Sequence, residues 1–370
     1  YFVLAAKSMG YQTAVLDPDP HAPAGASADI HIVAQYDDID ALKQLASVCS
    51  AVTVEFENPP VKSLEFLAQY VVVRPSPSSV AIAQNRREEK QFCQSIGLSV
   101  APYEVLETQE DVARITSNGV AQTHLDPFST PLIMKTCRNG YDGKGQQIVQ
   151  QLSDTMDHWN SLGNVSCIVE QKISLDAEFS VIISRGEDGE IALFMPTHNA
   201  HVDGILDISI APSHLSSQLL DQGKLAATKI AEMLNYVGVL AVEFFVSDNK
   251  LFVNELAPRP HNSGHWTIDA ARTSQFEQHL RAILDLPLGD PTMTAPFAVM
   301  GNILGGDKTD MYRPYLHLMA RNPELKFHQY KKEVRKGRKI GHVTVIGENL
   351  LELTEVAEHA RDYMSGEIDE

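Results

Sequence analysis

The feature that most constrains this chain is a pair of acidic residues placed inside two apolar segments. Residues 238–246 and 251–256 are rich in β-branched and aromatic side chains, and the turn-like sequence 247–250 joins them, so they predict a β-hairpin. If Asp248 to Lys250 form a three-residue loop, Glu243 and Glu255 lie directly opposite each other. Like charges at opposed positions destabilise a hairpin, and burying them unpaired raises their pKa until they neutralise.

A divalent cation between the two carboxylates would remove both costs. Oxygen ligands without cysteine or paired histidine favour magnesium or manganese over zinc, and magnesium usually shares its coordination shell with substrate phosphates. The hairpin therefore predicts a metal–nucleotide site; the alternative is two solvated carboxylates on an edge hairpin. The next segment favours the metal site, because a loop punctuated by proline and glycine gathers Arg259, His261, Asn262, Ser263 and His265.

Length and composition bound the class of protein. A chain of 370 residues can form two or three domains, and 44% hydrophobic and 21% charged residues are ordinary for a globular protein. The formal net charge of −18 disfavours nonspecific binding to nucleic acids or anionic membranes. No apolar run could span a bilayer, and no signal peptide is visible. The four widely spaced cysteines match no zinc pattern and fit buried, reduced thiols in a cytoplasmic enzyme.

The first part of the chain alternates helical and strand patterns. Because strands that alternate with helices form parallel sheets, residues 1–78 predict a small α/β domain. The sequence starts inside an amphipathic helix, so we expect that a first strand and a loop precede it. Asp17 and residues 55–58 follow strands and would lie near a site at the carboxyl ends of those strands, or else serve as turn residues and helix caps.

A glycine-rich loop follows the next informative strand. Lys135 ends the strand 132–135, residues 136–146 contain three glycines in six positions, and residues 147–150 continue as a strand. Such a loop forms a flap whose backbone N–H groups can approach an anion, and with Lys135 beside it we predict phosphate binding. It is not the Walker phosphate loop, because no helix follows; the alternative is an ordinary mobile hairpin tip. A helix over 81–95 carries Arg86, Arg87 and Lys90.

The remaining elements supply further acids and cations. Glu170 and Glu178 lie in apolar strands, residues 196–204 predict a turn region that contains histidine, and 215–236 and 267–284 predict long helices. Residues 297–370 predict a separate unit of short strands. Within it, residues 331–339 hold six cations in nine positions, which would be either a seat for an anionic substrate such as a sugar phosphate or a solvated edge protected by lysines.

The ordered set of these motifs resembles the ATP-grasp superfamily. The segments 139–146, 201–206, 254–267 and 337–342 are similar, more specifically, to 5-(carboxyamino)imidazole ribonucleotide synthetase of purine biosynthesis. The resemblance covers essentially the whole chain. It implies a mixed α/β fold with an N-terminal α/β domain (1–78), a central two-lobed ATP-grasp domain (79–290, with a flap lobe at about 107–173) and a small β-rich C-terminal domain (291–370).

The resemblance also implies a reaction and its residues. ATP would phosphorylate bicarbonate to carboxyphosphate, which would carboxylate the amine of aminoimidazole ribonucleotide without biotin. Glu243 and Glu255 would bind magnesium or manganese, and Asp142 would orient or deprotonate the amine. Catalytic roles fall to Tyr141, Asp142, Arg259 and Lys339; substrate binding to Arg338, Lys339, His261, Asn262 and Ser263. ATP binding falls to Arg86, Lys135, Gly140, Tyr141, Asp142, Gly143, Lys144, Gly145, Gln146, Glu170, Gln171, Lys172, Ile173, Glu178, His201, Asn254 and Glu255.

Other interpretations stay open at this point. A formate-dependent glycinamide ribonucleotide transformylase is also an ATP-grasp enzyme, and a catalytically silent nucleotide-binding regulator belongs to a different class of protein. The intact set of Lys135, Glu243, Glu255 and Arg259 disfavours the regulator. Family members carry an acid where His198 stands, so the role of His198 is open. The resemblance further implies a homodimer, and no nucleic-acid or membrane partner is expected.

Overall fold

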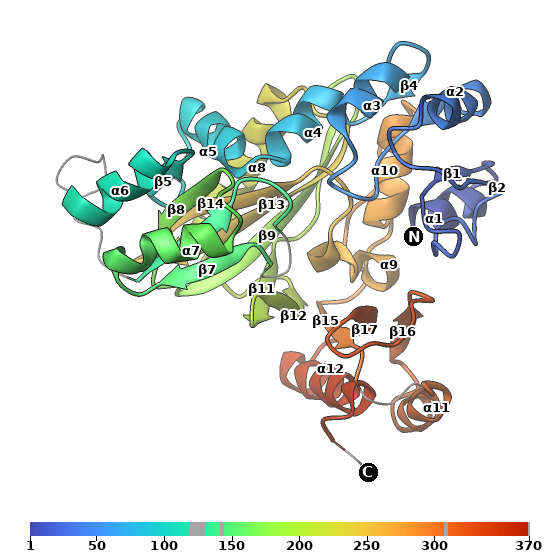
Figure 1. Ribbon diagram of the computed structural model, residues 1–370. Coiled ribbons are helices and arrows are strands. Elements are labelled where there is room, and N and C mark those ends of the chain that lie inside the picture. The colour runs from blue at the N-terminus through green and yellow to red at the C-terminus, as the bar shows by residue number, and fades with distance from the viewer. Residues whose placement is uncertain (119–130, 141–143, 307–309, 369–370) are drawn as a thin grey trace.

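A nine-stranded sheet organises the molecule, which is described here from a computed structural model of residues 1–118, 131–140, 144–306 and 310–368. The strands run in the order β14-β13-β9-β11-β12-β15-β17-β16, with β10 paired to β9 (Figure 1). A four-stranded sheet with α6 and α7 lies to one side of it. The N-terminal segment lies on the opposite side, near α10, and the C-terminal helices lie beyond β12.

The N-terminal segment has the predicted alternation of helices and parallel strands. β1 pairs with β2 and β3 with β4, both in parallel, as two separate two-stranded sheets. Leu42, Leu45 and Leu67 form its core. The elements are α1 (Phe2–Ser8), β1 (Ala14–Leu16), β2 (Ile30–Ile32), α2 (Ile39–Val48), β3 (Ala51–Val52), α3 (Val61–Leu67) and β4 (Val72–Val73).

The flap lobe is an antiparallel sheet in the order β5-β8-β6-β7, with α6 and α7 packed on it. Leu132, Met134 and Val169 face those helices and are fully buried. The elements are β5 (Tyr103–Leu106), α6 (Gln109–Asn118), β6 (Leu132–Thr136), β7 (Gln146–Val149), the 3₁₀ turn η2 (Leu152–Asp154), α7 (Thr155–Ser161) and β8 (Cys167–Gln171).

The central sheet is apolar on both faces. Phe179, Phe244 and Ile230 belong to the core under α8, whereas Trp266 and Phe194 belong to the core on the other face. The elements are β9 (Ala177–Arg185), β10 (Ile191–Leu193), β11 (Thr197–Val202), β12 (Ile205–Ala211), α8 (Ser217–Met233), β13 (Gly238–Ser247), β14 (Lys250–Ala257), η3 (Asn262–Gly264), α9 (Thr267–Ala270) and α10 (Gln275–Ile283).

The C-terminal segment extends the same sheet. β15 pairs antiparallel with β12, with Ile208 opposite Gly301, so the sheet runs without a break into the last part of the chain. The segment also contains two helices that the prediction of short strands did not include. The elements are β15 (Phe297–Leu304), α11 (Tyr312–Arg321), β16 (Lys326–Gln329), β17 (Lys339–Gly347) and α12 (Leu350–Ser365).

Three further predicted elements differ from the structure. The helix predicted over 81–95 is two helices, α4 (Pro77–Ala83) and α5 (Arg86–Ser95), because Asn85 leaves the helical conformation and accepts a hydrogen bond from the N–H of Arg87 as an N-cap. The helix predicted over 267–284 is α9 and α10, because Ala271 is extended and Ser274 caps α10. The predicted turn region 196–204 is mostly strand β11; only Asp203 and Gly204 turn, with φ of 51° and 78°.

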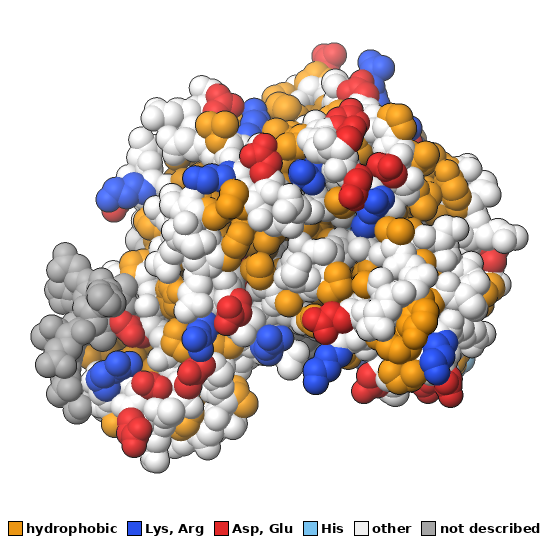
Figure 2. All heavy atoms as spheres, turned by 90° about the horizontal axis from the view of Figure 1, so that it is seen from above, with side chains coloured by type: hydrophobic (Ala, Val, Ile, Leu, Met, Phe, Trp, Pro, Cys, Tyr) orange, Lys and Arg blue, Asp and Glu red, His pale blue; other side chains and the backbone are white. Residues whose placement is uncertain are grey.

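The surface is mixed in character. On the face seen in Figure 2, acidic and basic side chains are interspersed and hydrophobic side chains form small groups. All four cysteines are unpaired, and Cys93, Cys137 and Cys167 are buried, as expected. Among the described residues, we find no helix with both the length and the apolar character needed to cross a membrane.

Candidate active site

The β13–β14 hairpin brings its two acids together, although by another route than the predicted loop. The loop has two residues, Asp248 and Asn249, both with positive φ (48° and 60°), which these residue types tolerate. A two-residue loop alone would set Glu243 opposite Asn254. A β-bulge between Glu243 and Phe244 shifts the register so that Glu243 pairs with Glu255, which confirms the predicted pairing.

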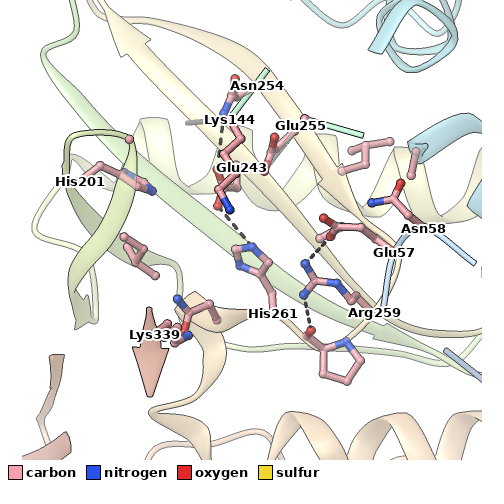
Figure 3. A pocket seen from close by; sticks show the side chains of 18 of the residues that line it. Glu57, Asn58, Lys144, His201, Glu243, Asn254, Glu255, Arg259, His261 and Lys339 are labelled. Carbon is pink, nitrogen blue, oxygen red and sulfur yellow. Dashed lines mark hydrogen bonds and ion pairs between the residues drawn. The ribbon is translucent and has the colours of Figure 1, made fainter. Parts of the chain in front are cut away.

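The bulge turns three polar side chains to one side of the hairpin. Asn254 Nδ2 lies 3.4 Å from Glu243 Oε2, and both Glu243 and Glu255 line the same cavity as Asn254 (Figure 3). Glu243 is buried at 8% exposure. Burial and the charge of Glu255 raise the pKa of Glu243 to about 8, against the lowering effect of His201. Two opposed carboxyl groups, one of them with a raised pKa, form the kind of pair that a divalent cation binds.

Arg86 joins this hairpin to the flap. As the first residue of α5, it directs Nη1 to Glu255 Oε2 at 3.3 Å and donates from Nη2 to the carbonyl of Gly140 at 3.4 Å. Its backbone N–H donates to the carbonyl of Cys137. Since the helix break at Asn85 sets this position, the break that the sequence pattern missed is what aims Arg86 into the site.

Glu170 is shared by two lysines. Lys90 Nζ lies 2.5 Å from Glu170 Oε1 and Lys135 Nζ lies 2.6 Å from Glu170 Oε2. Burial alone would raise the pKa of Glu170, but the charges and hydrogen bonds of Lys135 and Lys90 lower it to about 2. The resemblance implied that Glu170 accepts from an adenine amino group; in this structure its carboxylate holds Lys135 in place.

The turn of the flap hairpin requires glycine at position 145. Gly145 has φ of 72°, and a Cβ there would lie 2.7 Å from Thr136 Oγ1, so a side chain would not fit. The N–H of Thr136 donates to the carbonyl of Gly145 at 2.8 Å. Lys144 and Gln146 line the cavity, whereas Gly145 serves the turn. Three predicted site residues, Tyr141, Asp142 and Gly143, lie outside the described residues.

Glu178 and His201 form a pair on neighbouring strands. His201 Nδ1 lies 3.2 Å from Glu178 Oε2, and both residues line the cavity. Although burial lowers the pKa of His201, the hydrogen bond that it donates to Glu178 and the charges of Glu243, Glu178 and Glu255 raise that pKa overall. His201 therefore tends toward its charged form, next to three carboxylates.

The loop after β14 supplies the other end of the cavity. Arg259 pairs with Glu57, which follows strand β3, and Nη1 of Arg259 donates to the carbonyl of Pro260 at 3.0 Å. Lys339 contacts the side-chain oxygen of Asn262, and its ammonium lies 5.4 Å from the ring centre of Tyr330. Thus the N-terminal segment, the central sheet and the C-terminal segment meet here.

His261 is held in one orientation by two serines that lie outside the cavity. Its Nδ1 contacts Ser263 Oγ at 2.9 Å and accepts from the N–H of Ser263 at 3.3 Å, and Ser180 contacts Ser263 at 2.7 Å. Burial and the charges of Arg259 and Lys339 lower the pKa of His261 well below its usual range. A neutral ring whose Nδ1 accepts carries its proton on Nε2, the atom that lies 3.5 Å from Glu243 Oε1.

One cavity of about 1060 Å³ collects most of the predicted residues. Three of the described ones do not reach it: Gly145, which serves the flap turn, Arg338 and Ser263. Arg338 is exposed and donates to the carbonyl of Glu333 at 3.4 Å, and Ser263 is buried behind His261. Those that line it are Arg86, Lys135, Gly140, Lys144, Gln146, Glu170, Gln171, Lys172, Ile173, Glu178, His201, Glu243, Asn254, Glu255, Arg259, His261, Asn262 and Lys339.

The cavity also includes residues that the motif analysis did not assign. Glu89 lies three positions after Arg86 on α5, so helical spacing was a signal that could have found it. Lys332 belongs to the cationic segment 331–339 and Tyr330 directly precedes it; Lys332 Nζ lies 5.5 Å from the ring centre of Tyr330. Tyr1 and His265 pack edge to face at the same end, with ring centres 5.8 Å apart.

Fold and site together define an ATP-grasp enzyme, an ATP-dependent ligase. The ATP-grasp domain family matches residues 91–276, the ribonucleotide synthetase preATP-grasp domain matches residues 1–84, and the phosphoribosylaminoimidazole carboxylase C-terminal domain matches residues 298–356.

Whole-chain similarity narrows this class to one family. N5-carboxyaminoimidazole ribonucleotide synthase of Bacillus subtilis (strain 168) is 40% identical over 347 residues, which cover 92% of this chain and 87% of the relative. The structure of the synthetase from Thermus thermophilus superposes with a TM-score of 0.88 at 34% identity, covering 100% of this chain and 96% of the other. That of the Aspergillus clavatus synthase in complex with ADP and 5-aminoimidazole ribonucleotide gives 0.87 at 27% identity, with coverage of 99% and 95%. The chain belongs to the N5-carboxyaminoimidazole ribonucleotide synthase family.

Proposed function

We propose that this protein carboxylates the amine of 5-aminoimidazole ribonucleotide with bicarbonate and ATP, giving 5-(carboxyamino)imidazole ribonucleotide, ADP and phosphate. The single observation that carries the proposal is one cavity whose lining joins the opposed acids Glu243 and Glu255 and the cations Arg86 and Lys135 to a second, basic set of side chains, Arg259, Lys331, Lys332 and Lys339. The first end suits a nucleotide with its cation, and the second suits an anionic cosubstrate. Family membership and the relatives' names support this choice of reaction.

The nucleotide end has the charges that ATP requires. Arg86 and Lys135 would bind the phosphates, with Gly140 and Lys144 of the flap closing over them. Ile173 and the backbone beside Glu170 would contact the adenine ring, and Glu178 with His201 would face the ribose. A flap that closes over the phosphates would also exclude water from carboxyphosphate, which hydrolyses readily.

Magnesium fits the residues that are present. Among the described residues no group of three or more His, Cys, Asp or Glu side chains is placed to hold a metal by itself. Two opposed carboxylates, Glu243 and Glu255, match the few protein ligands of a magnesium ion that arrives with a triphosphate. The ion would neutralise phosphate charge, and manganese would serve similarly.

The second end would hold bicarbonate and the ribonucleotide. Arg259 would neutralise bicarbonate, and Nε2–H of His261 would donate to the same anion or to carboxyphosphate. Lys339, Lys331 and Lys332 line the cavity and would bind the phosphate of the ribonucleotide, whereas Arg338 faces solvent.

The chemistry balances in two steps. A bicarbonate oxygen attacks the γ-phosphorus of ATP, and the bond to the β-phosphate oxygen breaks to release ADP. The amine nitrogen of the ribonucleotide then attacks the carboxyl carbon of carboxyphosphate, the carbon–oxygen bond to phosphate breaks, and the nitrogen loses a proton. Charge neutralisation and positioning by the residues above, rather than a covalent enzyme intermediate, would carry the catalysis.

The test is ADP release with each cosubstrate omitted in turn. We expect ADP release that depends on bicarbonate and is stimulated by 5-aminoimidazole ribonucleotide, with loss of activity in a Glu255→Gln variant. Release that depends on formate and glycinamide ribonucleotide instead would contradict the proposal. We also propose a homodimer, from the family resemblance alone, which analytical ultracentrifugation of the pure protein would test.

A further inference from the structure

Helix α5 presents three ionisable side chains on one face toward the site. Arg86, Glu89 and Lys90 have the i, i+3 and i+4 spacing that places residues side by side on a helix. Arg86 pairs with Glu255 at 3.3 Å, and Glu89 accepts from the N–H of Leu256 at 2.5 Å. Lys90 instead reaches the flap lobe, where it pairs with Glu170. The helix therefore contacts both walls of the nucleotide end.

Lys90 is unusual because it is deeply buried and yet is not part of the cavity wall. It is 3% exposed, its ammonium lies 2.5 Å from Glu170 Oε1, and it lies 5.7 Å from the ring centre of Tyr103. Lys135, on the other oxygen of Glu170, does line the cavity. Buried lysines are rare unless paired, so the position of Lys90 calls for a partner, and Glu170 provides it.

The charges of Lys90, Lys135 and Glu170 suggest what Lys90 does. Two ammonium groups and one carboxylate leave a net formal charge of +1 at the wall where Lys135 faces the cavity. Without Lys90, Glu170 and Lys135 would cancel each other. A buried carboxylate with one partner would also attract that partner more strongly, in competition with a ligand.

We propose that Lys90 is a positioning residue for nucleotide binding: by pairing with one oxygen of Glu170, it keeps the positive charge of Lys135 available to the phosphates of the nucleotide. The inference rests on the proposed function in that ATP is the nucleotide bound at this end of the cavity. It adds to that function a residue that touches neither substrate nor metal and acts through Glu170.

The test compares the binding of ADP and of adenosine to the Lys90→Met variant. Lys90 would act on the positive charge that Lys135 presents to the phosphates, and adenosine has no phosphates. We therefore expect the affinity for ADP to fall by about tenfold and the affinity for adenosine to stay within about twofold. Lys90→Arg, which can hold the same carboxylate, should restore ADP binding. An equal loss for both ligands, or unchanged ADP affinity, would overturn the proposal.

Two further variants control for charge and for folding. Arg87→Met removes the neighbouring cation, whose partner Glu107 lies 2.5 Å away at the surface, and should leave ADP affinity within about twofold. Lys90→Gln keeps a hydrogen-bond donor to Glu170 without the charge. It should lose as much ADP affinity as Lys90→Met, and it replaces Lys90→Met in the test if that variant does not fold. Since ADP binding does not require carboxylation, normal ADP binding with no response to 5-aminoimidazole ribonucleotide would contradict the proposed function alone.

Discussion

Glu89 offers a quantitative test of how much stability the protein loses by burying an ionisable carboxyl group beside the site. Its side chain is 2% exposed and accepts the N–H of Leu256 on β14, the edge strand of the central sheet. Burial raises the pKa of Glu89 to about 8, with a further raising effect from the charge of Glu255 and lowering effects from Arg86, Leu256 and Lys90. The carboxyl group therefore prefers its neutral form in the folded protein.

The sign and size of the effect on stability follow from this pKa. A folded-state pKa above the unfolded value near 4.5 means that the contribution of Glu89 to stability is fully present below pH 4.5 and is lost as the pH rises to about 8. The difference between 4.5 and 8, at about 1.36 kcal/mol for each pKa unit, corresponds to about 5 kcal/mol. Glu89→Gln keeps an oxygen acceptor for Leu256 and cannot ionise, so it should escape this loss.

Thermal unfolding of the ligand-free protein between pH 5 and pH 8.5 would measure the effect. We expect the Tm of Glu89→Gln to exceed that of the unsubstituted protein by an amount that grows with pH and levels off near pH 8, because the free-energy advantage rises by about 1.4 kcal/mol for each pH unit up to the folded-state pKa of about 8. Glu88→Gln removes a carboxylate from the exposed side of the same helix and controls for the loss of one charge. An advantage for Glu89→Gln that is absent or independent of pH would refute the reasoning.

Two further predictions address the two ends of the cavity. Glu243→Gln and Glu255→Gln should each raise the magnesium concentration needed for half-maximal ADP release by at least about tenfold, because each removes a charged ligand of the ion, and an unchanged requirement would exclude the hairpin as the metal site. Lys339→Met should raise the KM for 5-aminoimidazole ribonucleotide by about tenfold and leave ADP affinity unchanged, since Lys339 contacts Asn262 after β14, whereas Arg86 and Lys135, the cations proposed for the nucleotide phosphates, lie on α5 and β6; calorimetry with ADP separates the two effects.

The hairpin illustrates what local sequence can and cannot predict. Residue type and spacing correctly indicated that Glu243 and Glu255 would pair, but the predicted three-residue loop was wrong. The structure reaches the same pairing through a shorter loop and a bulge at Asn254. The residues after the bulge are held by Glu89 and Arg86 of α5, more than 160 positions away. Contacts between residues so far apart in the sequence cannot be predicted from the sequence pattern of the hairpin itself.

The errors in the helices have a similar origin. The pattern over 81–95 is helical throughout, and the break at Asn85 depends on its capping bond and on the contact of Arg86 with Cys137 of the flap lobe. In β11, histidine and asparagine suggested a turn, yet pairing with both β9 and β12 makes a strand. In each case tertiary contacts overrode a weak local preference.

The pairing of charges is where sequence reasoning reaches its limit, and Glu170 shows why. The sequence shows it as an acid in an apolar strand, and the resemblance implies that it contacts adenine. The fold places its two oxygens between Lys90, from a helix, and Lys135, from a strand of the flap lobe, and neither partner was predicted. The chain has many cations that could pair with Glu170. In low-dielectric surroundings the energy of an ion pair changes strongly with distance, so a displacement of an ångström or two decides which cation is the partner. The same geometry decides whether Lys135 presents a net charge to the cavity, so the affinity for a nucleotide depends on a residue, Lys90, that no nucleotide motif contains.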